Sequence, residues 1–383
     1  MKRRKDGRLC AKVAIGNGKS KFVYAQTKKE LDRKVTELKI KMGKGIDVQA
    51  AEDTFGEWAE RWLKQKKTEV SVKRFTSYKA AISKFEDLND IPLNKIRAID
   101  LQDVINDQAA QGRSEQTLKI YRMAVSQIYQ LAIDNRVVEY NPSVAVKINT
   151  KAEPEYRRAL TEEEQQWICD TPHRAQTAAM IMMYAGLRRG ELIPLLWTDI
   201  DLEAKTISVN KAVEVEVNQS KVKSKGKTKA AIRVIHIPDK LVEYLKSVPK
   251  NNNMLVSASA NGKLHSNCSW RRMWESYIFE LNYKYGDFTN HIVIVDGIPQ
   301  AYKPPKKYAP TKIPVVIPQI TPHWLRHTYI TMLYLAGVDV MTAKDQAGHS
   351  DIKTTMQIYT HLDSVYKKKQ IDKLNDFLGG KMG

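Results

Sequence analysis

The sequence predicts a multidomain protein: a small β-sheet-plus-helix segment (residues 1–47), an all-helical segment (54–146) and a mixed α+β segment (159–383). Its length of 383 residues exceeds that of one ordinary domain and suits two or three. The spacing of apolar residues changes along the chain from alternation to helical intervals and then to a mixture of both. A polar, basic stretch at 147–158, which contains Pro154, has the composition of a linker between the last two segments.

The first segment has the pattern of two strands followed by one helix. Apolar residues alternate with others over residues 9–15, as they do in a half-buried strand. Residues 16–18 (Gly-Asn-Gly) then supply a turn, and residues 21–25 supply a return strand. Thr27 and Glu30 have capping-box spacing, so we expect a helix to begin there.

The second segment has apolar residues at helical intervals in four successive groups and no strand pattern between them. These groups are Phe55, Trp58, Ala59 and Trp62; Tyr78, Ile82 and Phe85; Leu101, Val104 and Ile105; and Leu118, Tyr121, Val125, Ile128 and Leu131. Ser114 is the expected start of the fourth helix, and the Asn141-Pro142 pair ends the pattern. The segment is therefore predicted to be all-helical.

The third segment mixes helices with one hairpin. A capping box at Thr161–Glu164 opens it. Thr206–Val215 and Ala231–Ile237 are the predicted strands, and Asn218–Lys229 is a lysine-rich loop between them. Six prolines interrupt residues 282–319, which we interpret as an extended insertion.

The charge of the chain favours a polyanionic partner. Lysine and arginine number 63 against 43 acidic residues, giving a net charge of +20. A basic surface gains free energy by releasing the counterions condensed on phosphates, so nucleic acid is favoured over a charge that serves solubility alone. No apolar run could cross a bilayer and no signal peptide is recognisable, so neither a membrane partner nor secretion is expected. The three cysteines are far apart, which argues against disulfides and a zinc site and suits a reducing cytoplasm.

Two arginine-containing boxes in the third segment could bind a phosphate. Arg188 lies in Gly-Leu-Arg-Arg-Gly-Glu-Leu, where one predicted helix ends and another begins. Its planar guanidinium suits two phosphate oxygens, although an ion pair with Glu191 is the alternative. His323 and Arg326 are three residues apart, which places both on one helix face. For these two, the alternative is a helix cap and an ion pair with an acid.

Two further boxes could supply the reacting groups. Lys227 lies in the lysine-rich loop and could donate a proton to a leaving oxygen, although a solvated basic patch is the alternative. Gly348-His349-Ser350 precedes a predicted helix, and Tyr359 follows ten residues after His349. The alternative for Tyr359 is an ordinary aromatic residue on a helix face.

Together, these boxes in this order resemble the tyrosine recombinase family, which includes the integrases of phages and conjugative transposons. The sequences GLRRGEL, KTK (227–229) followed by RVI (233–235), HWLRHT and GHSDIKTTMQIYTH match its characteristic motifs. The likeness covers the whole third segment, which resembles the catalytic domain. The helical segment resembles the core-binding domain, and residues 1–47 resemble the three-stranded, arm-type DNA-binding domain.

The resemblance implies a role for each matching residue that binds the scissile phosphate. Arg188 and Arg326 would hold its non-bridging oxygens, while His323 and His349 would hydrogen-bond to it and assist proton movement. Glu191 would support the site without reacting.

The resemblance also implies the reacting groups. Tyr359 would attack phosphorus and form a 3′-phosphotyrosine, and Lys227 would be the general acid for the 5′-hydroxyl leaving group. Lys225 and Lys229 are alternatives to Lys227. No metal, ATP or other cofactor is expected, because fixed cationic side chains can stabilise the charge and no P-loop is present.

The partners implied are double-stranded DNA at core and arm attachment sites, other copies of the chain in a tetramer, a small excision factor and a host DNA-bending protein. An apolar stripe from Leu362 to Leu378 would be the helix exchanged between protomers. A type IB topoisomerase, a non-catalytic DNA-binding regulator and an RNA-binding protein are the alternatives. The arm-like segment argues against the first, and the complete set of boxes argues against the other two.

Overall fold

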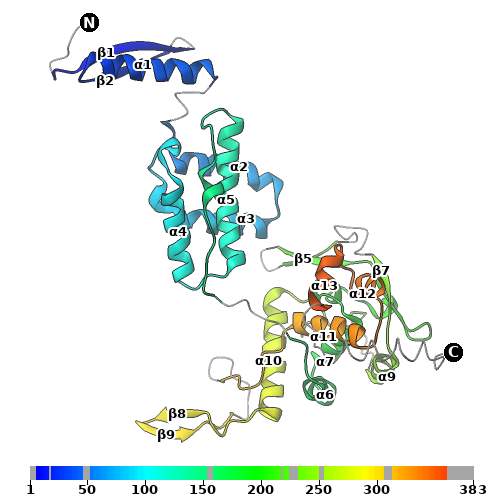
Figure 1. Ribbon diagram of the computed structural model, residues 1–383. Coiled ribbons are helices and arrows are strands. Elements are labelled where there is room, and N and C mark those ends of the chain that lie inside the picture. The colour runs from blue at the N-terminus through cyan, green and yellow to red at the C-terminus, as the bar shows by residue number, and fades with distance from the viewer. Residues whose placement is uncertain are drawn as a thin grey trace, which may run out of the picture. The chain divides into compact units, whose positions relative to one another are not determined.

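The computed structural model describes residues 6–16, 19–45, 52–152, 158–216, 219–223, 232–249, 254–305 and 313–359. The chain divides into two compact units, residues 1–155 and 156–383, and the division falls inside the predicted linker. Figure 1 shows the elements of each unit. The finer boundary between the first two predicted segments stays a prediction.

The first unit begins with a two-stranded antiparallel sheet and a helix. β1 (Leu9–Gly16) pairs with β2 (Lys19–Ala25), and α1 (Lys28–Gly43) packs against them. The hydroxyl of Thr27 accepts a hydrogen bond from the backbone N–H of Glu30 at 3.2 Å, as the capping pattern predicted. This cap begins α1 directly after β2, so residues 6–16 and 19–45 contain two strands and not the third that the resemblance implied.

The rest of the first unit is helical, as predicted. Among residues 52–152, its α-helices are α2 (Phe55–Glu69), α3 (Val72–Ile82), α4 (Ala98–Ala110) and α5 (Glu115–Asp134). Large apolar side chains from all four form one core that includes Phe55, Trp62, Leu101 and Ile128. The residues chosen for their helical spacing therefore identified the buried faces correctly.

The second unit is built around α7. Its helices are α6 (Glu162–Asp170), α7 (Gln176–Ala185), α8 (Arg189–Leu192), α9 (Asp239–Ser247), α10 (Asn267–Tyr285), α11 (Pro322–Leu335), α12 (Val340–Ala347) and α13 (Ile352–Tyr359). Residues 178–185 are all buried, which is typical of a helix that is apolar on every side. α11, α6 and α9 pack around α7, so the end of this helix is held within the core.

The second unit also contains several short strands, where the sequence predicted a single hairpin. They are β3 (Ile200–Asp201), β4 (Thr206–Val209), β5 (Ala212–Glu216), β6 (Gln219–Lys223), β7 (Arg233–His236), β8 (Ile292–Val295) and β9 (Ile298–Ala301). The predicted strand 206–215 is two strands, because β4 pairs with β7 while β5 pairs with β6. The predicted loop contains β6, and its lysine-rich composition concealed a strand whose register places Lys221 opposite Glu214.

The predicted extended insertion contains regular structure among its described residues. α10 continues to Tyr285, and β8 and β9 form a hairpin beyond the end of that helix (Figure 1). Asp296 and Gly297 join the two strands with positive φ angles of 51° and 80°. An Asp-Gly pair between apolar residues is a strong hairpin signal, and the proline content of the segment obscured it.

Gly186, which ends α7, is a position where we expect substitution to be costly. Its φ is +65°, and a Cβ atom there would lie 2.2 Å from Cδ1 of Tyr329 on α11. Gly186→Ala is expected to lower the free energy of unfolding of this unit by about 2–4 kcal/mol, through left-handed strain and overpacking together. Thermal or urea unfolding measures this loss. Gly297→Ala is the control, because its φ is +80° but a Cβ atom there meets nothing within 4 Å. An equal effect in both variants would contradict the packing argument.

Candidate active site

Arg188 lies at the helix junction that the sequence predicted. α7 ends at Gly186, and Arg188 immediately precedes α8. Its Nη1 donates to Oε1 of Glu191 at 2.8 Å, and its Nη2 donates to the carbonyl of Gly348 at 2.7 Å. The predicted ion pair with Glu191 therefore exists, but the Arg188 side chain remains 40% exposed and can still meet a ligand.

His323 and Arg326 lie one turn apart at the start of α11 and line one cavity. This cavity, of about 230 Å³, is also lined by Arg188 and His349. The alternative that His323 caps the helix is wrong, because the hydroxyl of Thr321 accepts the capping hydrogen bond. The structure therefore brings together four residues from three separate sequence boxes.

Arg326 is the buried member of this group. Its side chain donates hydrogen bonds to the carbonyl oxygens of Gly186 and Ala347, and the residue is 3% exposed. Burial, and next the nearby charge of Arg188, lower the pKa of Arg326 to about 9. The alternative of an ion pair with an acid is not what the described residues show, because these hydrogen bonds go to main-chain carbonyls. Arg326 is therefore a cation held in place without a carboxylate directly on it.

His349 is buried at the end of α12 and is tied to α13. Its Nδ1 and the hydroxyl of Thr355 are hydrogen-bonded at 2.9 Å, and Thr355 is fully buried. Burial lowers the pKa of His349 to about 4, and the charges of Arg326, Arg188, Arg233 and His323 act in the same direction. His349 is therefore neutral at pH 7 while the cavity holds no anion.

Tyr359 is the last residue of α13, which confirms the predicted helix there. α13 packs against α11 and α12, and the position of Tyr359 is one helical turn beyond Thr355. The side chain of Tyr359 lies outside the described part of the structure. Lys227, Lys225 and Lys229 lie outside it entirely, as does the apolar stripe from residue 362 to 378. The roles given to these residues stay predictions.

Arg233 on β7 belongs to a box that matches the family, but the sequence predicted no role for it in the site. Its Nη2 and Nη1 donate to the two oxygens of Glu191 at 2.9 and 3.2 Å. Burial acts to raise the pKa of Glu191, but the hydrogen bonds from Arg233 and the neighbouring charges outweigh it and hold that pKa at about 2. A signal was present, since a single arginine begins the strand that follows the lysine-rich loop.

The described groups at this cavity carry an excess of positive charge. Arg188 and Arg233 share the carboxylate of Glu191, and Arg326 lies near them without pairing with it. Three guanidinium groups and one carboxylate leave two net positive charges beside a neutral His349. Like charges held together away from water are unfavourable unless an anion compensates them. The arrangement can therefore bind a phosphate group and stabilise the negative charge that it gains during reaction.

The depressed pKa of His349 predicts how stability depends on pH. Its ordinary pKa is 6.5 and its native pKa is about 4, so between these values the unfolded chain binds a proton that the native protein does not. The free energy of unfolding of the native protein is expected to fall as pH is lowered through this window. Between pH 7 and pH 4.5, the fall in His349→Gln should be smaller than in the native protein by on the order of 1–3 kcal/mol. Urea unfolding at a series of pH values measures the difference. Native protein and variant losing stability in parallel would contradict the low pKa.

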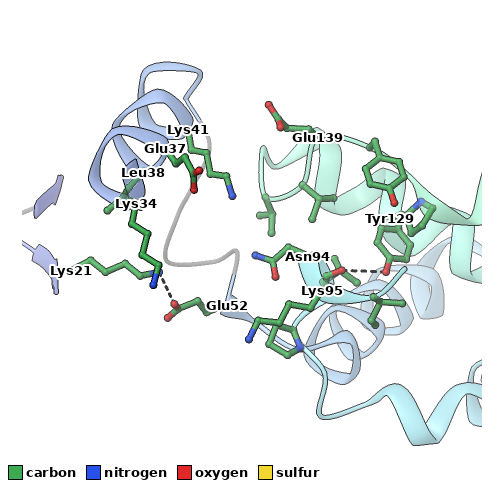
Figure 2. Close-up of a pocket in the computed structure, with 17 residues that line it drawn as sticks. Lys21, Lys34, Glu37, Leu38, Lys41, Glu52, Asn94, Lys95, Tyr129 and Glu139 are labelled. Carbon is green, nitrogen blue, oxygen red and sulfur yellow. Dashed lines mark hydrogen bonds and ion pairs between the residues drawn. The ribbon is translucent and has the colours of Figure 1, made fainter. Parts of the chain in front are cut away.

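A larger hollow in the first unit lacks such chemistry. Figure 2 shows this cavity of about 500 Å³ with Lys21, Lys34, Lys41 and Lys95 around it. The one tyrosine hydroxyl labelled there, on Tyr129, donates to the carbonyl of Leu93 at 3.2 Å, and burial raises its pKa further above the ordinary value. Glu37, Glu52 and Glu139 line it as well as the lysines, so we interpret the hollow as a charged surface feature of this unit.

The described residues contain no group of three or more His, Cys, Asp or Glu side chains placed to hold a metal ion. None of their helices is both long and apolar enough to pass through a membrane.

Comparison with known protein families finds two matches. The phage integrase family matches residues 152–293 and 300–365, and the N-terminal SAM-like domain of phage integrases matches residues 54–108. The first match contains every residue of the cavity described above and the position of Tyr359. The second lies within the helical part of the first unit.

Among curated proteins, the chain is 28% identical over 389 residues to a XerC-like tyrosine recombinase of Caldanaerobacter subterraneus subsp. tengcongensis, covering 95% of both chains. It is 22% identical to the transposase of transposon Tn916 from Enterococcus faecalis, covering 97% of this chain and 93% of the relative. Among solved structures, the Tn1549 transposon integrase in complex with transposon right end DNA matches with a TM-score of 0.65 and 18% identity, over 83% of this chain and 99% of that one. A lambda integrase tetramer bound to a Holliday junction matches with a TM-score of 0.56 and 18% identity, over 94% and 96%. At these identities, the structural matches show a shared fold.

Proposed function

This chain belongs to the phage integrase family and is a tyrosine recombinase of mobile elements, and we propose that Tyr359 is its nucleophile and that the cavity beside Arg188, Arg326 and His349 holds the scissile phosphate. The observation that carries the proposal is the excess of positive charge: Arg188 and Arg233 share one carboxylate, and Arg326 beside them has none directly on it. A phosphodiester would supply the missing negative charge. Its attacked form would supply more, so the same groups favour the transition state over the ground state.

The proposed cleavage step forms one bond and breaks another. The phenolic oxygen of Tyr359 bonds to phosphorus, and the bond from phosphorus to the 5′ oxygen breaks. The phenol passes its proton to one of the two histidines of the cavity as it attacks, and the leaving oxygen takes up a proton from Lys227 to become a 5′-hydroxyl. Reversal of the same step with a different 5′-hydroxyl rejoins the strand, so the energy of the phosphodiester is kept and no nucleotide cofactor is needed.

The histidines and arginines have distinct parts in this proposal. Arg188 and Arg326 bind the non-bridging oxygens, because each guanidinium presents parallel N–H donors. His323 and His349 hydrogen-bond to the same phosphate and help to move protons. The hydrogen bond between Thr355 and His349 supports this, since a ring held at Nδ1 keeps its other nitrogen for the phosphate.

The proposed partner is double-stranded DNA at the recombination sites of a phage or conjugative transposon inside a bacterial cell. The net charge of +20 supports affinity through phosphate contacts. The helical part of the first unit and the second unit would hold the core site, and β1, β2 and α1 would bind a separate arm site. The working complex would be a tetramer, with the segment beyond Tyr359 exchanged between protomers and a small excision factor and a DNA-bending protein as accessories.

The test is a suicide substrate: a labelled duplex with the joined ends of the element and a nick a few nucleotides 3′ of the cleavage point. The short fragment with the freed 5′-hydroxyl then diffuses away, so a covalent adduct accumulates. We expect the protein to remain on the 3′ phosphate of the labelled strand and to be released by protease. Free DNA ends without attached protein would refute the proposal. Relaxation of supercoiled plasmid without that site would instead favour a topoisomerase.

A further inference from the structure

Arg233 joins three elements at the side of the cavity. It begins β7, and its side chain is 8% exposed. In addition to its two hydrogen bonds to Glu191, its Nε donates to the carbonyl of Gln346 on α12 at 3.1 Å. The guanidinium group therefore already donates hydrogen bonds to Glu191 and Gln346, and little of its surface is exposed to a ligand.

The same guanidinium fixes the turn that follows α12. A Cβ atom at Gly348 would lie 2.7 Å from Cζ of Arg233, and Gly348 has a φ of +64°. The carbonyl of Gly348 in turn accepts the hydrogen bond from Nη2 of Arg188. Both arginines therefore contact the same turn: Arg233 packs against the Cα atom of Gly348, and Arg188 donates to its carbonyl.

Glu191 is the second link between the two arginines. Its carboxylate accepts four hydrogen bonds, from the backbone N–H and Nη1 of Arg188 and from Nη1 and Nη2 of Arg233. Without Arg233, the full negative charge of this buried carboxylate would act on Arg188 alone. Part of the positive charge of Arg188 would then be cancelled before any phosphate arrives.

We propose that Arg233 is a positioning residue: it neutralises and holds Glu191, and thereby sets the guanidinium of Arg188 against the scissile phosphate without touching DNA. This inference rests on the proposed function, which assigns the phosphate to Arg188. The alternative is that Arg233 only anchors β7, the strand after the lysine-rich loop, and so affects the general acid. The first idea concerns how the attacked phosphate is held, and the second concerns how the leaving 5′ oxygen is protonated.

The experiment compares Arg233→Met with the native protein in single-turnover adduct formation at saturating suicide substrate. We expect the rate to fall on the order of 10–100-fold while DNA affinity changes less than about threefold, because affinity comes from many phosphate contacts that Arg233 does not make. Arg158→Met is the matched control, since Arg158 also donates two hydrogen bonds to a buried carboxylate, that of Glu164, and does not line the cavity. An equal loss of rate in the control would overturn the proposal.

A substrate with sulfur in place of the bridging 5′ oxygen separates positioning of the phosphate from positioning of the acid. A thiolate leaves without a general acid, because its pKa is well below that of an alcohol. We expect Lys227→Ala to regain its rate on this substrate and Arg233→Met to stay slow. Rescue of Arg233→Met would overturn the proposal in favour of the loop.

The double variant Arg233→Met/Glu191→Gln tests neutralisation itself. It leaves no buried carboxylate without a counter-charge, so it also guards against a single variant that does not fold. We expect the double variant to be faster than Arg233→Met alone. A double variant that is no faster would contradict the electrostatic link.

A titration with inorganic phosphate tests the role of Arg233 without any cleavage. Phosphate binding is measured from the ring NMR signals of His349. We expect Arg233→Met to weaken phosphate binding several-fold, and unchanged binding would overturn the proposal. If the native protein forms no adduct, Tyr359 as nucleophile fails, yet this titration still decides whether Arg233 sets the anion site.

Discussion

Tyr359→Phe is expected to abolish the covalent adduct with DNA while leaving DNA binding intact. Phenylalanine keeps the ring at the end of α13 but removes the only atom that is proposed to bond to phosphorus. Because no other step can form the link, the rate of adduct formation should fall by at least about 10⁴-fold. Affinity should hardly change, since phosphate contacts elsewhere provide most of it.

The measurement is the labelled suicide substrate with a gel-shift titration on the same DNA. Tyr329→Phe is the matched control, because Tyr329 lies in the same unit beside Arg326, yet it is buried and its pKa is raised by burial to about 12. The control variant should still form the adduct. An adduct that persists in Tyr359→Phe, or that disappears only in Tyr329→Phe, would show that the nucleophile is another residue.

Sequence spacing was enough to predict the parts of the site that depend on local structure. His323 and Arg326 lie on one face because they are three residues apart on a helix, and Arg188 lies at a junction because Gly186 ends α7. Both features follow from backbone geometry over a few residues. The helical core of the first unit was equally accessible, because its apolar spacing is regular.

The features that the sequence did not reveal depend on contacts between distant segments. Arg233 and Glu191 are 42 residues apart, and only the fold shows that they pair. The burial of Arg326 and its hydrogen bonds to Gly186 and Ala347 likewise require α7 and α12 to be in place. The split of one predicted strand into β4 and β5 has the same origin, since the choice of pairing partner decides it.

The second large effect is expected at Arg326, where substitution should greatly reduce activity and change stability little. Arg326→Met is expected to slow cleavage on the order of 10²–10³-fold, the usual result of removing one fixed donor from a site of developing charge. The residue is 3% exposed, so an effect on folding must be considered as well.

Two opposing terms decide the effect on folding. Loss of the side chain leaves the carbonyls of Gly186 and Ala347 without these hydrogen bonds, at about 1–3 kcal/mol for each unsatisfied group. It also removes a desolvated cation that Arg188 and Arg233 repel, and relief of a buried charge offsets a cost of this size. The free energy of unfolding should therefore change by less than about 2 kcal/mol.

Urea unfolding with and without inorganic phosphate makes the test independent of DNA. Phosphate should stabilise the native protein, because a ligand that binds only the folded state adds to its stability. In Arg326→Met this gain in stability should largely disappear. The control is Arg189→Met, which should keep the gain, because Arg189 donates to Asn267 and does not line the cavity. A variant that loses several times more stability than predicted would make Arg326 a structural residue. A variant that cuts DNA normally would remove it from the site, and the argument for an anion held by unneutralised charge would fail with it.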